Sequence, residues 1–124
     1  MIIFPNAKIN IGLHITEKLT DGYHAIETIF YPVKLADMLE FVENKESNKT
    51  TLEISGLNLS GTVTNNLVLK AYNLLAQYHT IPPLKIHLHK IIPAGAGLGG
   101  GSADAAFFLN LLNDYYNLKI KMFI

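Results

Sequence analysis

The chain has 124 residues, the usual size of one domain, and 49% of them are hydrophobic, so a folded core is expected and disorder is excluded. Ten basic residues balance ten acidic ones, which argues against a nucleic-acid partner and leaves small-molecule ligands open. The sequence has no cysteine, which excludes disulfides and thiolate chemistry. It shows no targeting leader and no stretch long enough to cross a membrane, so we expect a protein of the cytoplasm without a membrane partner.

Hydrophobic alternation dominates the first half of the chain. Residues 7–16 alternate strictly between apolar and polar side chains, which predicts a strand with one buried side. Asp21-Gly22 signals a turn. Further strands are expected at about residues 25–33, 37–43 and 51–54.

The second half of the chain shows helical spacing on either side of one more strand. A helix is expected from about residue 66, with Asn65 or Asn66 as its cap, and Pro82-Pro83 ends that region. A strand over about residues 84–92 follows, and a last helix is expected from Ser102 to about Asn117. This order predicts an α+β fold in which helices cover one face of a mainly antiparallel sheet.

A glycine-rich loop, "IPAGAGLGGGSADAAF", connects that strand to the last helix. It fits the dinucleotide fingerprint G-x-G-x-x-G, but it follows a late strand and lacks the acidic residue that binds ribose. It also fits the glycine spacing of a P-loop, with Gly101 where the lysine belongs. Small residues here could simply allow a tight turn. Glycines directly before a helix also expose backbone N–H groups at the positive end of the helix dipole. We therefore expect the loop to bind phosphate.

Polar side chains elsewhere offer weaker signals. Lys8 and Asn10 share one strand face, either as a solvated surface or as a polar floor beneath a ligand. Tyr23 and His24, after the turn, could stack on and hydrogen-bond a heterocycle. His87 and His89 have the spacing of two metal ligands, but no third ligand is evident, so we expect a solvated surface.

Four segments in order resemble the GHMP kinase superfamily, and within it the 4-diphosphocytidyl-2-C-methyl-D-erythritol kinase family: "PNAKINIGLHI", "DGYH", "NNLVLKA" and "IPAGAGLGGGSADAA". The resemblance extends from Pro5 to about Asn117. It implies a two-layer α+β fold like domain 2 of ribosomal protein S5, with residues 1–124 as the N-terminal, ATP-binding domain. It also implies phosphorylation of 4-diphosphocytidyl-2-C-methyl-D-erythritol by ATP with Mg²⁺, in the non-mevalonate route to isoprenoid precursors.

The same resemblance implies roles for individual residues. Lys8 matches the active-site lysine, Asn10 a contact to the methylerythritol group, and Tyr23 and His24 the pair that recognises cytosine. Asn66 and Lys90 match contacts to the adenine region, and Ser102 a residue that helps to position Mg²⁺. The residues that match the ATP-phosphate loop are Pro93, Ala94, Gly95, Ala96, Gly97, Leu98, Gly99, Gly100, Gly101, Ser102 and Ala103.

The sequence departs from the family pattern in one respect. The G-A-D-x-P motif that supplies the family's catalytic aspartate does not occur. We therefore expect a truncated N-terminal portion without the C-terminal domain, inactive alone and open to self-association. The alternatives are a dinucleotide-binding module of the NAD type, another GHMP small-molecule kinase, and an RNA-binding domain, against which the zero net charge argues.

Overall fold

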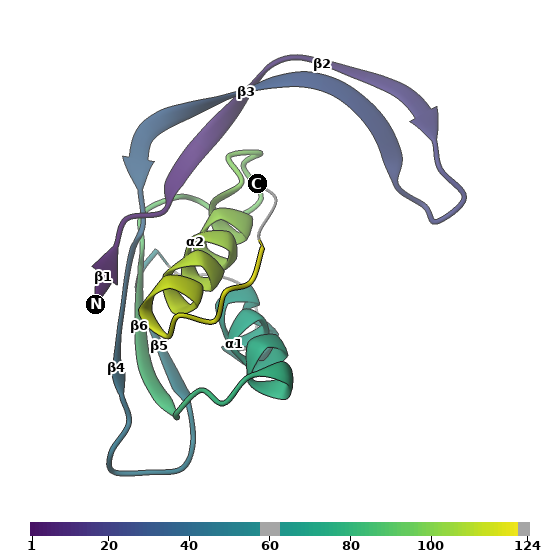
Figure 1. Cartoon of the computed structure of the whole chain (residues 1–124). Coiled ribbons are helices and arrows are strands. Elements are labelled where there is room, and N and C mark those ends of the chain that lie inside the picture. The colour runs from purple at the N-terminus through teal and green to yellow at the C-terminus, as the bar shows by residue number, and fades with distance from the viewer. Residues whose placement is uncertain (58–62, 122–124) are drawn as a thin grey trace.

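The computed structural model describes residues 1–57 and 63–121 (Figure 1). The elements in chain order are β1 (Ile2–Ile3), β2 (Asn6–Lys18), β3 (His24–Ala36), β4 (Met38–Glu43), β5 (Thr51–Gly56), a 3-10 turn (Val63–Asn65), α1 (Leu67–Tyr78), β6 (Leu84–Lys90) and α2 (Gly100–Tyr115). The domain expected over residues 1–124 includes 58–62 and 122–124, which lie outside the described residues, so its bounds stay a prediction.

The body of the molecule has two layers. One layer is a four-stranded sheet in the order β1-β4-β6-β5, and α1 and α2 cover one of its faces (Figure 1). β4 pairs antiparallel with β1 and β6, whereas β5 runs parallel to β6. The α+β prediction, with helices on one face of a mainly antiparallel sheet, is confirmed.

Strand β6 shows how the sequence pattern forms the core. Its side chains alternate, so that Leu84, Ile86 and Leu88 are buried while the intervening residues are partly exposed. The helices complete this core, and Phe108 of α2 meets Phe41 of β4 edge to face with ring centroids 6.1 Å apart. The predicted inward face of the strand is therefore confirmed.

The two helices begin in different ways. Asn66 is the N-cap of α1, where its side-chain oxygen accepts a hydrogen bond from the Val68 N–H at 2.8 Å, as expected. α2 begins at Gly100, before the expected Ser102, because Gly99 adopts a left-handed conformation (φ 69°) that turns the loop into the helix. Within the described residues, no helix is long and apolar enough to cross a membrane.

Strands β2 and β3 pair only with each other and form a long hairpin that arches away from the body (Figure 1). The hairpin turn at Asp21-Gly22 is confirmed, with Gly22 at φ 88°. The expectation of a buried side along residues 7–16 is wrong in this structure. Ile9, Ile11, Leu13 and Ile15 are exposed, because no element of the described chain covers either face of the hairpin beyond its base.

The end of β5 lies unusually close to the end of β6. Gly56 has φ 86°, and a Cβ atom there would collide with the carbonyl oxygen of Lys90. The N–H of Leu57 donates to that same carbonyl at 3.0 Å. Gly56 thus allows the backbone of β5 to hold the last residue of β6 in place.

Candidate phosphate-binding site

The glycine-rich loop between β6 and α2 has a backbone suited to binding an anion. Gly95, Gly97 and Gly99 have positive φ angles of 72°, 75° and 69°, whereas Ala96 and Leu98 between them do not. Such alternation of handedness turns successive N–H groups toward one side and forms a concave anion-binding nest. Residues 93–97 are exposed, so a ligand can reach this nest.

The space around each glycine distinguishes an anion-binding nest from a turn that needs small residues only for packing. A Cβ atom at Gly95 or Gly97 would meet nothing within 4 Å, so these two positions require glycine for its conformation. Gly100 differs, because a Cβ atom there would lie 2.7 Å from Cγ2 of Ile92. Packing therefore explains Gly100, and the alternating backbone explains Gly95 and Gly97.

The hydrogen bonds of the loop leave its donors available. The carbonyls of Gly97, Leu98 and Gly99 all accept hydrogen bonds, from Lys8 and from the Ala103 N–H. The N–H groups of the same three residues donate none within the described part of the chain. The first turn of α2 follows, where N–H groups have no intrahelical partner and the helix dipole is positive. Ser102, the third residue of this helix, is exposed.

Lys8 joins the base of the hairpin to this loop. Its backbone N–H donates to the Leu98 carbonyl at 3.0 Å, and its Nζ donates to the Gly97 carbonyl at 3.0 Å. The same Nζ donates to Oδ1 of Asn10 at 3.1 Å and lies 5.3 Å from the ring centroid of Phe30. The structure thus brings Lys8 and Asn10, expected on one strand face, to the expected phosphate loop.

Asn66 lies at the edge of the same region. The first residue of α1, Leu67, is so close to Gly101 that a Cβ atom there would lie 3.8 Å from its Cδ1. The N-terminal ends of α1 and α2 are therefore neighbours. Asn66, the cap of α1, belongs to this neighbourhood.

Tyr23 and His24 lie elsewhere, at the tip of the hairpin, which projects away from the body (Figure 1). Both side chains are exposed, and the N–H of Tyr23 donates to Oδ1 of Asp21 at 2.9 Å within the turn. Tyr23 and His24 therefore lie next to each other at the hairpin tip, and the structure does not bring them to the glycine-rich loop.

Lys90 is buried, with 3% of its surface exposed. Its ammonium donates to Oδ2 of Asp37 and, at 2.8 Å, to Oδ2 of Asp104. Burial alone would lower the pKa of Lys90, but the two carboxylates raise it above its usual value. Contact between this side chain and a nucleotide would require the ammonium to become exposed.

The two aspartates have opposite pKa shifts. Burial raises the pKa of Asp104 to about 7, against the effect of Lys90. Burial also tends to raise the pKa of Asp37, but the N–H groups of Ile92 and Ile91 and the Lys90 ammonium together hold it below its usual value. At neutral pH the buried cluster therefore contains one firmly ionised carboxylate and one that is titrating.

Sequence reasoning missed Asp37 and Asp104 as members of this region. A signal was available for Asp104, which lies four and eight residues before Phe108 and Leu112 and therefore on the buried stripe of α2. An acidic residue on such a stripe needs a buried partner. Asp37 lies between two apolar strand segments, which is a weaker form of the same signal.

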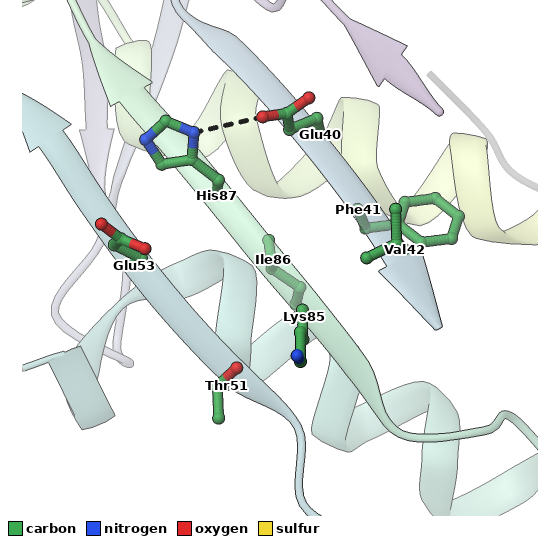
Figure 2. A pocket seen from close by; sticks show the side chains of 8 residues that line it. All are labelled: Glu40, Phe41, Val42, Thr51, Glu53, Lys85, Ile86 and His87. Carbon is green, nitrogen blue, oxygen red and sulfur yellow. Dashed lines mark hydrogen bonds and ion pairs between the residues drawn. The ribbon is translucent and has the colours of Figure 1, made fainter. Parts of the chain in front are cut away.

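The face of the sheet opposite α1 and α2 carries a different polar group. Oγ of Ser55 lies 2.8 Å from Nε2 of His87 and 2.8 Å from Nδ1 of His89, and Nδ1 of His87 lies 3.3 Å from Oε1 of Glu40. Figure 2 shows the adjoining groove of about 280 Å³, which crosses β4, β5 and β6. It is lined by Glu40, Phe41, Val42, Thr51, Glu53, Lys85, Ile86 and His87. The groove shares no residue with the glycine-rich loop.

Comparison with known proteins shows which protein family this fold and loop resemble. Residues 66–123, which include α1, β6, the loop and α2, match the family model described as the GHMP kinases N-terminal domain. This part of the chain is therefore similar to the N-terminal domain of the GHMP kinases.

Its particular relatives are 4-diphosphocytidyl-2-C-methyl-D-erythritol kinases. The chain is 59% identical over 121 residues to the one from Bacteroides fragilis and 56% identical over 121 residues to the one from Cytophaga hutchinsonii. These alignments cover 97% and 98% of the chain but 44% of each relative. The chain thus spans less than half the length of the curated relatives that it matches.

Solved structures give the same result. A crystal structure of 4-(cytidine 5'-diphospho)-2C-methyl-D-erythritol kinase matches with a TM-score of 0.77 and 34% identity, over 98% of this chain and 42% of that one. Mevalonate pyrophosphate decarboxylase from Streptococcus pyogenes matches with a TM-score of 0.68 at 12% identity, over 98% and 39%, and shows the shared fold alone. The predicted resemblance to this family, over its N-terminal portion, is confirmed.

Proposed function

We propose that the chain forms the ATP-binding part of a kinase that phosphorylates 4-diphosphocytidyl-2-C-methyl-D-erythritol in the non-mevalonate route to isoprenoid precursors. The observation that carries this proposal is the 3.0 Å contact between Nζ of Lys8 and the carbonyl of Gly97. It unites a lysine with a nest of N–H groups that donate to no other described residue, and together they provide the charge and the directed donors that a triphosphate requires. The substrate is inferred from the names of the relatives.

Phosphoryl transfer depends mainly on positioning and on neutralising charge over the transferred oxygens. In the proposed complex, the N–H groups of the loop and of the first turn of α2 bind the ATP phosphates. Lys8 exchanges its bond to the Gly97 carbonyl for one to a phosphate oxygen. Asn10, already bonded to Lys8, then lies next to the acceptor alcohol.

Mg²⁺ would arrive with ATP and neutralise charge on its phosphate oxygens. Among the described residues, no group of three or more His, Asp or Glu side chains could hold a metal ion. We therefore assign most of its ligands to the nucleotide and to water, with the exposed hydroxyl of Ser102 as the protein group beside it.

The remaining assignments concern the two heterocycles. The exposed ring of Tyr23 is available to stack on cytosine, and His24 next to it can hydrogen-bond the base. We infer that Asn66, the cap of α1, contacts the adenine. A cytoplasmic location, self-association and little turnover by this chain alone stay predictions.

Calorimetry with a non-hydrolysable ATP analogue and Mg²⁺ tests the proposal. We expect the analogue to bind and to be displaced by ATP but not by NAD. Binding of NAD without competition from the analogue would instead favour a dinucleotide-binding module. If neither nucleotide binds, the proposed function is wrong.

A further inference from the structure

The cluster of Asp37, Lys90 and Asp104 lies where the glycine-rich loop begins and ends. Lys90 is the last residue of β6, immediately before the loop, and Asp104 is in the second turn of α2, immediately after it. Asp37 comes from a third place in the chain, between β3 and β4. All three side chains are almost fully buried.

Asp37 fixes the start of the loop. Its Oδ1 accepts hydrogen bonds from the N–H groups of Ile91 at 2.6 Å and Ile92 at 2.8 Å, while its Oδ2 accepts from the Lys90 ammonium. Its own N–H donates to the carbonyl of the buried Pro5 at 2.9 Å. One carboxylate therefore holds three consecutive residues against the rest of the body.

The Lys90 ammonium carries this restraint to the end of the loop. It donates to Asp104 at 2.8 Å, and a Cβ atom added to Gly100 would lie 3.3 Å from the same nitrogen. The first turn of α2 is thus pressed against the ammonium that Asp37 holds. The two ends of the nest are connected through a single buried nitrogen atom.

Stability alone is a poor explanation for this cluster. Buried ion pairs are often no more stabilising than apolar residues of similar volume, because burial removes the charges from water. Oδ1 of Asp104 is buried and has no hydrogen-bond partner among the described residues, which is a further penalty. What such a cluster provides, and an apolar contact does not, is a directed link between fixed atoms.

We propose that Asp37, Lys90 and Asp104 are positioning residues that hold the glycine-rich loop in its phosphate-binding shape. The proposal rests on the proposed function. It extends that function because it gives the buried Lys90 the role of holding the loop in shape, in place of a direct contact with the nucleotide. The cluster touches no reacting atom and acts through the backbone of residues 91–100.

The test compares Lys90→Met with Lys85→Met in this chain. Lys85 is on the same strand, but its ammonium forms a surface ion pair with Glu46 at 2.6 Å. Hydrogen exchange is followed at the N–H groups of Ile91, Ile92 and Ala103, which are bonded at the two ends of the loop. Affinity for the ATP analogue is measured in parallel.

We expect Lys90→Met to accelerate exchange at these three N–H groups by about tenfold or more, with the paired residues of β4 and β6 unchanged. A loop that keeps its binding shape about a tenth of the time would bind the analogue about tenfold more weakly. Lys85→Met should change neither measurement. Unchanged exchange in Lys90→Met, or an equal rise throughout the sheet, would overturn the proposal.

Two further outcomes are decisive. If circular dichroism shows that Lys90→Met does not fold, Asp104→Asn takes its place, because it keeps the shape of the side chain. It should accelerate exchange at Ala103 and spare Ile91 and Ile92, and unchanged exchange at Ala103 would overturn the proposal. If the unmodified chain binds no analogue, the proposed function fails, and the exchange measurements still decide whether the cluster holds the loop.

Discussion

The ammonium of Lys8 and the carbonyl of Gly97, 89 positions apart in the chain, lie 3.0 Å from each other. The contact joins the base of the β2–β3 hairpin to the middle of the glycine-rich loop. It keeps a positive charge next to N–H groups that donate no hydrogen bond within the described residues. Charge and donors are therefore arranged before any ligand arrives, which lowers the cost of ordering them on binding.

The first prediction concerns that charge. Lys8→Met should weaken binding of a non-hydrolysable ATP analogue by about 10- to 100-fold, because a charge-assisted hydrogen bond contributes about 1.5–3 kcal/mol. Lys18→Met, near the tip of the hairpin on the same strand, is the control and should bind normally. Calorimetry that finds equal affinity in both variants would contradict the role of Lys8.

The second prediction separates glycines that are needed for their conformation from those that are not. Gly97→Ala places a side chain at φ 75° and should destabilise the chain by about 1 kcal/mol, although the site has room for it. Gly101→Ala lies in a helix with only ordinary contact to Leu67 and should stabilise the chain by up to about 1 kcal/mol. Thermal unfolding gives the sign of each change, and a gain in stability for Gly97→Ala would argue against the nest.

The third prediction is a pH dependence that follows from Asp104. The pKa of Asp104 is about 7 in the folded chain and 3.8 in the unfolded reference, so unfolding releases a proton between these pH values. The contribution of this group to stability therefore falls as pH rises toward 7. An asparagine does not titrate, so Asp104→Asn escapes this loss. The free energy of unfolding of Asp104→Asn, relative to that of the unmodified chain, should therefore rise by roughly 2 kcal/mol from about pH 5 to pH 7.

Urea unfolding at several pH values measures that difference. Asp114→Asn, which removes an exposed carboxylate from the same helix, serves as the control and should follow the unmodified chain. A constant difference between Asp104→Asn and the unmodified chain across the range would show that Asp104 does not titrate there.

The fourth prediction tests base recognition at the hairpin tip. Tyr23 is 74% exposed, so Tyr23→Ala should leave the fold intact. It should also weaken binding of cytidine diphosphate by about 1–3 kcal/mol, the usual contribution of a base stacked on an aromatic ring. Tyr78→Ala removes a tyrosine of α1 that is 75% exposed and should bind cytidine diphosphate normally. Indistinguishable affinities would remove Tyr23 from the substrate site.

The sequence predicted what depends on local pattern. The alternation over Leu84, Ile86 and Leu88 gave the inner face of β6, and Asn66 gave the start of α1, because each feature is encoded within a few residues. The glycines of the loop were also visible in the sequence, and Gly95 and Gly97 do adopt the positive φ angles that favour this residue type. Phosphate binding by the loop stays a prediction.

Features that depend on distant segments escaped the same reasoning. The alternation in residues 7–16 is as clear as that of β6, yet Ile11 and Ile15 are exposed, because burial depends on a covering element and not on the strand itself. The buried cluster joins positions 37, 90 and 104, and no local pattern links an aspartate between strands to a lysine 53 residues later.

Gly56 affects how the results of a mutagenesis screen of this fold should be interpreted. A side chain there would strike the Lys90 carbonyl, so the position should reject replacement as firmly as the glycine-rich loop does, although it lies outside that loop. In a saturation mutagenesis screen scored by ATP binding, residue 56 would rank among the binding positions. Its intolerance to substitution would reflect the backbone contact that supports the glycine-rich loop, and not a contact with a ligand.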